Sequence, residues 1–175
     1  MKVIIASDIH GNLEYTRKLE KLIEKENPDR LILLGDIYYH GPRNSLPKEY
    51  NPIKVSEILN KYTDIIIAVR GNCDAEVDDM ISNFNITADY KEIILDGTKF
   101  YITHGHLLDK LNNIIKDSYV FYGHTHVYDI ANKKINPGSV GIPKVNSEHT
   151  VILYENKILT LLDLDDFKEI ESKKI

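Results

Sequence analysis

Five short polar motifs hold most of the side chains whose types and spacing could perform chemistry. They are Asp8-Ile9-His10, Gly35-Asp36, Gly71-Asn72-Cys73-Asp74, His104-Gly105-His106 and Gly123-His124-Thr125-His126. Each follows an apolar run that is typical of a buried strand. Together they supply carboxylate, amide and imidazole ligands, a mixture that suits Mn, Fe or Zn better than Mg or Ca, which prefer oxygen shells. The motifs therefore predict a site for divalent metals and metal-assisted hydrolysis of a phosphoester.

The spacing within two of these motifs lets one segment supply two metal ligands. Residues two apart point to the same side of an extended chain, as Asp8 and His10 do, and likewise His124 and His126. Two ions about 3.5–4 Å apart would hold a bridging hydroxide and clamp the phosphoryl oxygens for in-line attack. A single carboxylate between the ions is the usual arrangement, and Asp36 is the natural bridge.

The first three motifs must be positioned by a parallel sheet. Continuous apolar runs predict buried strands at Val3–Ala6, Leu31–Leu34 and Ile65–Val69. Apolar residues at helical spacing predict helices between them, at about Asn12–Glu26 and Ile53–Tyr62. This βαβαβ order implies parallel strands with right-handed crossovers. Loops beyond the carboxyl ends of such strands form a binding crevice, so Asp8, Asp36 and Asn72 should converge there.

The second half of the chain has a different pattern of predicted elements, in which short strands dominate. A hairpin is predicted for Tyr90–Leu95 and Lys99–Thr103 around Asp96-Gly97-Thr98, followed by a helix at Leu108–Ile115 and a strand at Tyr119–Tyr122. Further strands are predicted at Val127–Ala131, Thr150–Tyr154 and Ile158–Leu164, and the tail Lys168–Ile175 fits a strand or a helix. The expected class is α/β, with two mixed sheets packed face to face and helices outside.

Composition sets outer limits on the function. The 175 residues are 42% hydrophobic, which predicts a single globular domain over residues 1–175. The formal net charge of −5 argues against stable nucleic-acid binding. One cysteine, Cys73, allows no intramolecular disulfide. No run approaches the roughly 18 apolar residues of a membrane span, and the first apolar run is too short for a signal peptide. We therefore expect a cytoplasmic protein that does not bind membranes.

The motif series as a whole resembles the calcineurin-like metallophosphoesterase family. Three further segments are similar to the small bacterial phosphodiesterases of the YfcE type within it: His40-Gly41-Pro42-Arg43-Asn44, Val69-Arg70-Gly71-Asn72-Cys73-Asp74 and Asn136-Pro137-Gly138-Ser139. The resemblance spans Met1 to about Pro143. It implies a four-layer α/β/β/α sandwich, two mixed sheets flanked by helices. It also implies a small phosphodiester substrate and two divalent metal ions, with manganese expected and zinc, iron or nickel as alternatives. Relatives often self-associate, so a homodimer or homotetramer is left open.

The resemblance also implies a division of the ligands between two ions. One ion would be bound by Asp8, His10, Asp36 and His126, and the other by Asp36, Asn72, His104 and His124. The residues expected to act directly in catalysis are Asn72, His104 and His106.

One departure from the wider superfamily concerns the proton donor. Its phosphoprotein phosphatases carry His after the motif Asn, where this chain has Cys73, and an extra arginine after Gly-Asp, where Ile37-Tyr38-Tyr39 follows here. A neutral thiol, with a reference pKa of roughly 8.5, is a poor substitute for that His as the proton donor to the leaving group. We therefore expect no phosphoprotein phosphatase activity. Protonation of the leaving group would come from His106 or water, which favours diesters with good leaving groups.

Several residues have a plainer alternative interpretation. His106 fits support of the site or solvent exposure as well as catalysis, and Arg70 fits an ion pair as well as substrate binding. We interpret His40 and His149 as surface or loop residues, and Cys73 as a packed neighbour of the site. The loop His40–Tyr50 could cover the site, contact another subunit or be ordinary surface. Asn136–Ser139 is expected to form a tight turn near the site.

Two other functions stay open beside the phosphodiesterase. A phosphomonoesterase or nucleotidase could use the same metal site, because the sequence does not fix the substrate pocket. A non-catalytic scaffold is disfavoured. The retromer subunit that resembles this family has lost part of its metal-ligand set, while all seven metal-ligand positions are intact in this chain. A nuclease is a weaker alternative for an acidic chain that has no room for a DNA-capping domain.

Overall fold

The computed structural model describes all 175 residues and contains two β-sheets. The first sheet has the order β11-β10-β9-β1-β2-β3, with bounds β1 (Lys2–Ala6), β2 (Arg30–Leu33), β3 (Ile66–Ala68), β9 (Thr150–Glu155), β10 (Ile158–Asp163) and β11 (Glu169–Lys174). The second has the order β4-β5-β6-β8-β7, with bounds β4 (Tyr90–Leu95), β5 (Thr98–Thr103), β6 (Tyr119–Phe121), β7 (Tyr128–Asp129) and β8 (Lys134–Pro137). Both sheets mix parallel and antiparallel pairs.

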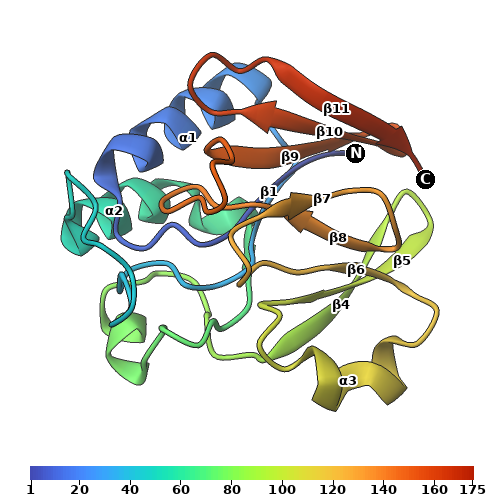
Figure 1. The fold of residues 1–175 in the computed structure, drawn as a ribbon, viewed down its shortest axis with the longest axis horizontal. Coiled ribbons are helices and arrows are strands. Elements are labelled where there is room, and N and C mark those ends of the chain that lie inside the picture. The colour runs from blue at the N-terminus through green and yellow to red at the C-terminus, as the bar shows by residue number, and fades with distance from the viewer.

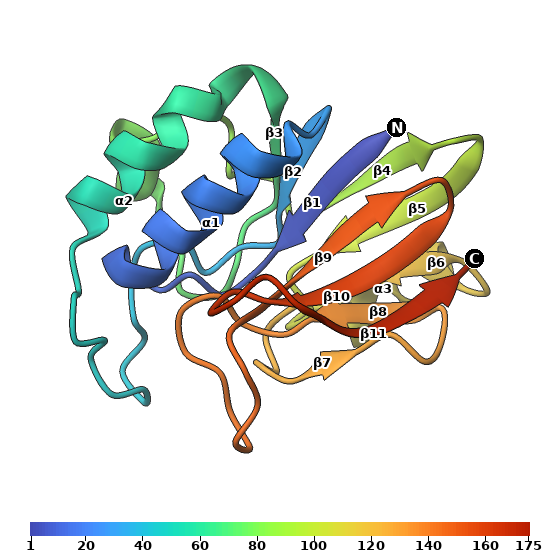
Figure 2. The same ribbon diagram turned by 90° about the horizontal axis from the view of Figure 1, so that it is seen from above.

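Three α-helices cover the outer faces of the two sheets. Helices α1 (Leu13–Glu26) and α2 (Pro52–Leu59) lie together beside β1, β2 and β3, and α3 (Leu108–Ile115) lies on the far side of the molecule (Figure 1, Figure 2). The apolar stripe of α3 packs on the second sheet, where Leu111 and Ile115 contact Tyr101 and Val120. The predicted four-layer α/β/β/α sandwich is therefore confirmed.

Strand β1 is buried on both faces, as its continuous apolar sequence predicts. Ile4 and Ala6 belong to the core under α1 and α2. Val3 and Ile5 belong to the core between the two sheets. Because successive side chains of a strand point to opposite faces, one five-residue strand joins two cores. This places the end of β1, and the motif that follows it, at the centre of the molecule.

The helix boundaries follow from local chemistry. The side chain of Asn12 accepts a hydrogen bond from Tyr15 N and caps the start of α1, and Asn27, which follows the last helical residue, adopts the left-handed conformation. The side chain of Asn51 caps α2 in the same way, and Pro52 occupies the first turn, where no N–H is needed. The predicted start and end of α1 are confirmed to within one residue.

Three predicted elements differ from the structure. Helix α2 ends at Leu59, and a 3₁₀ helix (Asn60–Ile65) delays the third strand to Ile66–Ala68. The strand predicted for residues 127–131 is reduced to Tyr128–Asp129. The charged tail, for which a strand and a helix were both predicted as alternatives, agrees with the strand: β11 pairs antiparallel with β10 at the sheet edge.

The tight turn predicted for residues 136–139 is wrong, because this segment is part of a strand followed by an isolated bridge between Ser139 and His149. Residues 136 and 137 belong to β8, which pairs parallel to β6 and antiparallel to β7. A buried polar residue hides this strand from a periodicity argument. The amide of Asn136 donates to Gly123 O at 2.9 Å and to Thr125 Oγ1 at 3.0 Å, so a fully buried Asn is satisfied there. None of the helices is both long and apolar enough to cross a membrane.

Candidate metal centre

The parallel ladder continues past the strand ends and places the first two motifs side by side. Asp8 N donates to Gly35 O at 3.1 Å, and His10 N donates to Asp36 O at 2.9 Å. The second sheet joins them, because His124 N donates to Asp8 Oδ2 at 2.9 Å and Gly123 N donates to His104 O at 2.8 Å. Residues from both sheets therefore meet at one edge, as strand-end positions in an α/β protein predict.

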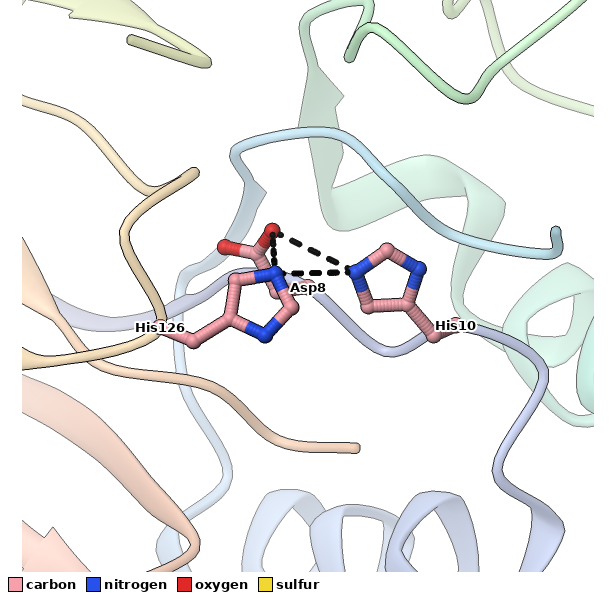
Figure 3. Close-up of side chains that lie close together, drawn as sticks. All are labelled: Asp8, His10 and His126. Atoms are coloured by element: carbon pink, nitrogen blue, oxygen red, sulfur yellow. Dashed lines mark hydrogen bonds and ion pairs between the residues drawn. The ribbon is translucent and has the colours of Figure 1, made fainter. Parts of the chain in front are cut away.

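Asp8, His10 and His126 form the first cluster of possible metal ligands (Figure 3). The Oδ1 atom of Asp8 lies 3.3 Å from Nε2 of His126 and 3.6 Å from Nε2 of His10. The two imidazole nitrogens lie 3.2 Å apart. Three ligand atoms of different residues thus converge on one point, and all three side chains are buried.

A second cluster is built around Asp36 and His104. The Oδ2 atom of Asp36 lies 3.3 Å from Nε2 of His104 and 3.7 Å from Nε2 of His10. His104 Nε2 also lies 3.0 Å from Asn72 Oδ1 and 3.3 Å from His124 Nδ1. Asp36 therefore lies between the first cluster and the second. The structure brings all seven predicted ligand positions together.

Backbone carbonyls fix which nitrogen of three imidazoles faces the clusters. His10 Nδ1 lies 2.7 Å from Tyr39 O, His104 Nδ1 lies 2.8 Å from Leu34 O, and His126 Nδ1 contacts Ile142 O. A carbonyl can only accept, so each Nδ1 carries the proton and donates it. Each Nε2 is thereby directed at the cluster, the arrangement that orients imidazoles in metal sites.

The carboxylate of Asp8 supports the presence of a cation most directly. Its Oδ2 atom accepts from Ser7 Oγ at 2.6 Å and from His124 N at 2.9 Å. Its Oδ1 atom is buried and has no hydrogen-bond partner. A buried, unpartnered carboxylate oxygen is costly unless a positive charge faces it. The donor set and this orphan oxygen together fit a divalent ion.

Five residues of the clusters adopt a backbone conformation that is unfavourable for any residue except glycine. Their φ angles lie between 52° and 69° in the left-handed region; they are Asp8, His10, Asp36, His124 and His126. Such residues cost on the order of 1–3 kcal/mol each and gather at functional sites. Space is equally restricted, since a Cβ on Gly71 would lie 2.1 Å from Asp36 Oδ1. The local structure is therefore built around ligand positions and not around ordinary turns.

The charges of the clusters are strongly coupled in the absence of an ion. Burial alone would raise the pKa of Asp8, but the adjacent imidazoles of His10 and His126 outweigh it and hold that pKa far below its ordinary value. Burial alone would lower the pKa of His104, but its bond to Asp36 and the charge of Asp8 raise it to about 9. The carboxylates thus stay ionised and hold positive charge close by, as they would hold metal ions.

Asp74 is a supporting residue whose role the motif Gly71–Asp74 does not predict. Its carboxylate is buried and accepts three backbone N–H groups: Oδ2 from Asp36 at 2.8 Å and Gly71 at 2.7 Å, and Oδ1 from Ile37 at 2.8 Å. It therefore ties the loop after β2 to the loop after β3. Asp74 is the last residue of the Gly71–Asp74 motif, so the sequence marks its position. Its three hydrogen bonds depend on the conformation of a turn, which residue spacing does not predict.

Four other predicted residues lie around the clusters. Cys73 Sγ is near His10 and Asp36, but burial and then Asp36 raise its thiol pKa to about 12, which keeps it neutral. The ring centroid of His106 lies 5.5 Å from that of His104, outside the clusters. Arg70 forms an ion pair with Asp89, its plainer alternative. His149, predicted to be a surface or loop residue, lies outside the named strands just before β9, where it is half-buried and stacks on Tyr15.

An open pocket of about 900 Å³ adjoins the clusters. Asp36, Asn72, His124 and His126 are among the residues that line it. Residues 41–44 also line it, so this part of the loop at residues 40–50 lies beside the site. Asn72 and His124 are the least buried of the seven ligand positions. A substrate would therefore reach the clusters from their side.

The chain belongs to the calcineurin-like phosphoesterase superfamily, because the family model for the superfamily domain matches residues 1–157. It is 40% identical over 173 residues to phosphodiesterase YfcE of Escherichia coli K12, covering 95% of this chain and 94% of that protein. It is 34% identical to phosphodiesterase MJ0936 of Methanocaldococcus jannaschii, over 83% of this chain and 90% of that one.

Solved structures agree with this assignment. The structure of the E. coli phosphoesterase Yfce superposes with a TM-score of 0.92 at 39% identity, covering 100% of both chains. Vacuolar protein sorting 29 from Cryptosporidium parvum superposes with a TM-score of 0.65 at 17% identity, covering 99% of this chain and 98% of that one. The second likeness shows a shared fold and nothing more.

Proposed function

We propose that this protein is a phosphoric diester hydrolase that works with two divalent metal ions. The observation that carries the proposal is the position of Asp36, whose Oδ2 lies 3.7 Å from His10 Nε2 and 3.3 Å from His104 Nε2. One carboxylate between two ligand clusters is what a pair of neighbouring ions requires. The E. coli and M. jannaschii relatives, both named phosphodiesterases, support the choice of reaction.

The proposed ligand sets follow the two clusters. Asp8, His10, Asp36 and His126 would hold one ion, and Asp36, Asn72, His104 and His124 the other. When bound, such ions activate water and neutralise charge on the phosphoryl oxygens. We propose manganese, since the mixed oxygen and nitrogen donors suit it; zinc, iron and nickel accept similar donors.

The protein's own contribution to the reaction is orientation. The carbonyls of Tyr39, Leu34 and Ile142 hold three imidazoles in one tautomer, so little reorganisation is needed during the reaction. Asn72 and His124 face the pocket, where they would align the phosphodiester for displacement of one ester oxygen. Water attacks phosphorus and loses a proton to solvent, the bond from phosphorus to one ester oxygen breaks, and the departing alcohol takes a proton from His106 or from solvent. His106 stays in the proposal as the proton donor.

The pocket favours a small substrate over a polymer. It is a local hollow at one sheet edge, and the net charge of −5 repels a nucleic-acid backbone away from the metals. A phosphomonoesterase on the same clusters is the second candidate, because the clusters bind the phosphoryl group and not its substituents. The scaffold alternative loses support from the buried, oriented ligand set, which a docking role does not require.

A panel of metals and substrates tests this proposal. We expect bis-p-nitrophenyl phosphate to be hydrolysed faster than p-nitrophenyl phosphate, with Mn²⁺ as the best metal. Asp36→Asn should lose activity by a factor on the order of 100 or more, since it removes the shared ligand. Asp166→Asn, an exposed carboxylate outside the site, is the control. Unchanged hydrolysis in Asp36→Asn would contradict the proposal, and faster monoester hydrolysis would favour the second candidate.

A further inference from the structure

The pocket beside the metal centre contains two cationic side chains that the proposed hydrolysis does not use. They are Arg43 and Lys144, and apart from histidines they are the only basic residues among its lining residues. Two of the three other arginines form ion pairs, Arg17 with Glu49 and Arg70 with Asp89, and Arg30 donates to Asp29 O. Neither Arg43 nor Lys144 forms an ion pair, and both are exposed. Their positive charge is therefore available to a ligand.

The acidic residues of the same pocket do not neutralise these cations. Asp74 is occupied by three backbone N–H groups. Asp36 belongs to the metal clusters, and its Oδ1 accepts from Cys73 N at 2.7 Å. In a chain with a net charge of −5, two free cations in one pocket create a local attraction for anions.

Both cations are carried on segments that are bonded to metal-ligand histidines. On one side, Tyr39 O accepts from His10 Nδ1, and Asn44 Nδ2 donates to His40 O at 2.7 Å, which folds the loop that carries Arg43. This loop packs tightly, since a Cβ on Gly41 would lie 3.2 Å from Cys73 Sγ.

The other side is tethered in the same way. Lys144 N donates to His126 O at 3.2 Å, and His126 Nδ1 bonds to Ile142 O. A tight turn holds the segment, because Ser147 Oγ donates to Lys144 O at 2.8 Å. The backbone segments that carry both cations are thus tied to the metal centre, and both residues line the same pocket.

We propose that Arg43 and Lys144 form a subsite for a second anionic group carried by the substrate. The preferred substrate would then be a small phosphodiester whose retained arm bears a further phosphate. This inference rests on the proposed function and specifies its substrate class. Charge-assisted hydrogen bonds from a guanidinium and an ammonium suit a phosphate dianion.

The test uses two substrates that differ only in the second anion. They are thymidine 5′-(p-nitrophenyl phosphate) and the same compound with a 3′-phosphate, both of which release p-nitrophenolate. We expect wild-type protein to show a kcat/KM ratio on the order of ten in favour of the 3′-phosphate, mainly through KM, and a smaller ratio at high salt. The double variant Arg43→Ala/Lys144→Ala should bring the ratio close to one. Arg30→Ala/Lys168→Ala, which removes the same charges elsewhere, should preserve it.

Three outcomes would overturn the subsite. They are a wild-type ratio near one, a ratio preserved in the double variant, and inhibition of wild type by inorganic phosphate that is lost in the double variant while the substrate ratio is unchanged. The last would assign the cations to a free anion. Calorimetry of thymidine 3′,5′-bisphosphate against thymidine 5′-phosphate on the manganese-loaded protein tests the subsite without catalysis. Tighter calorimetric binding of the bisphosphate, together with no hydrolysis of any diester, would support the subsite while rejecting the proposed function.

Discussion

Asp8 Oδ1 lies 3.3 Å from Nε2 of His126, and this oxygen has no hydrogen-bond partner although it is buried. The other oxygen of the same carboxylate is held by Ser7 Oγ and His124 N. One side of Asp8 is thus fixed by the protein, and the other is left for a cation that His126 also faces. The orientation of the free oxygen therefore depends on the two hydrogen bonds that hold the other oxygen.

Ser7→Ala should weaken manganese binding by about tenfold, because Asp8 loses one of the two bonds that orient it. The free energy of unfolding of the metal-free protein should fall by only about 1 kcal/mol. Ser56→Ala is the matched control, since its buried hydroxyl bonds to Ile53 O far from the site. Calorimetric titration with Mn²⁺ measures both variants. Equal affinity for wild type and Ser7→Ala would show that Ser7 does not position the ligand.

Asp74→Asn should destabilise the protein by about 2–3 kcal/mol, because an amide cannot accept all three backbone N–H groups that the carboxylate accepts. One of its N–H donors would face another donor. Asp78→Asn, which alters a single exposed bond to Ala75 N, should cost far less. Urea unfolding of the metal-free variants compares them, and similar losses in both would remove Asp74 from its supporting role.

Much of this centre could be predicted because its residues follow strands. Asp8, Asp36 and His104 come directly after buried apolar runs, and strand ends in an α/β sheet share an edge. The role of Asp74 could not be predicted in this way, because it depends on a turn that directs three N–H groups at one carboxylate. Strand β8 was missed for a similar reason: Asn136 looks like a turn residue until its two buried partners are known.

His149 should make folding sensitive to acid. Burial lowers its pKa below the ordinary 6.5, although its bond to Val140 O and the charge of Asp165 act in the opposite direction. The unfolded chain then binds this proton more tightly than the folded protein does. The contribution to stability is therefore present above pH 6.5 and is lost as the pH falls through the lower, folded-state pKa.

His149→Asn separates this effect from other acid-sensitive groups. The side-chain amide of asparagine occupies the position of the imidazole Nδ1, so it can still donate to Val140 O, but it does not titrate. We expect wild type to lose more stability than the variant when the pH falls from 7.5 to 5. Over this range His149 of the unfolded chain gains about one positive charge. Urea midpoints at both pH values measure the change. Parallel losses in the two proteins would mean that His149 is not the sensitive group.

His106→Ala tests the source of the leaving-group proton. If His106 supplies it, the variant should slow diesters with poor alcohol leaving groups by about 10²–10⁴-fold, but p-nitrophenyl esters much less, since p-nitrophenolate leaves without a proton. Rates for a methyl and a p-nitrophenyl ester of the same phosphate make the comparison. An equal loss for both esters would leave water as the donor.

The central claim is that this chain binds two metal ions and needs both to hydrolyse a phosphodiester. Titration of metal-free protein with Mn²⁺, followed by the hydrolysis of bis-p-nitrophenyl phosphate, tests it most directly. The account predicts two ions per chain and activity that appears as the second ion binds. Full activity in excess chelator, or a fully loaded protein that leaves the diester intact, would contradict it.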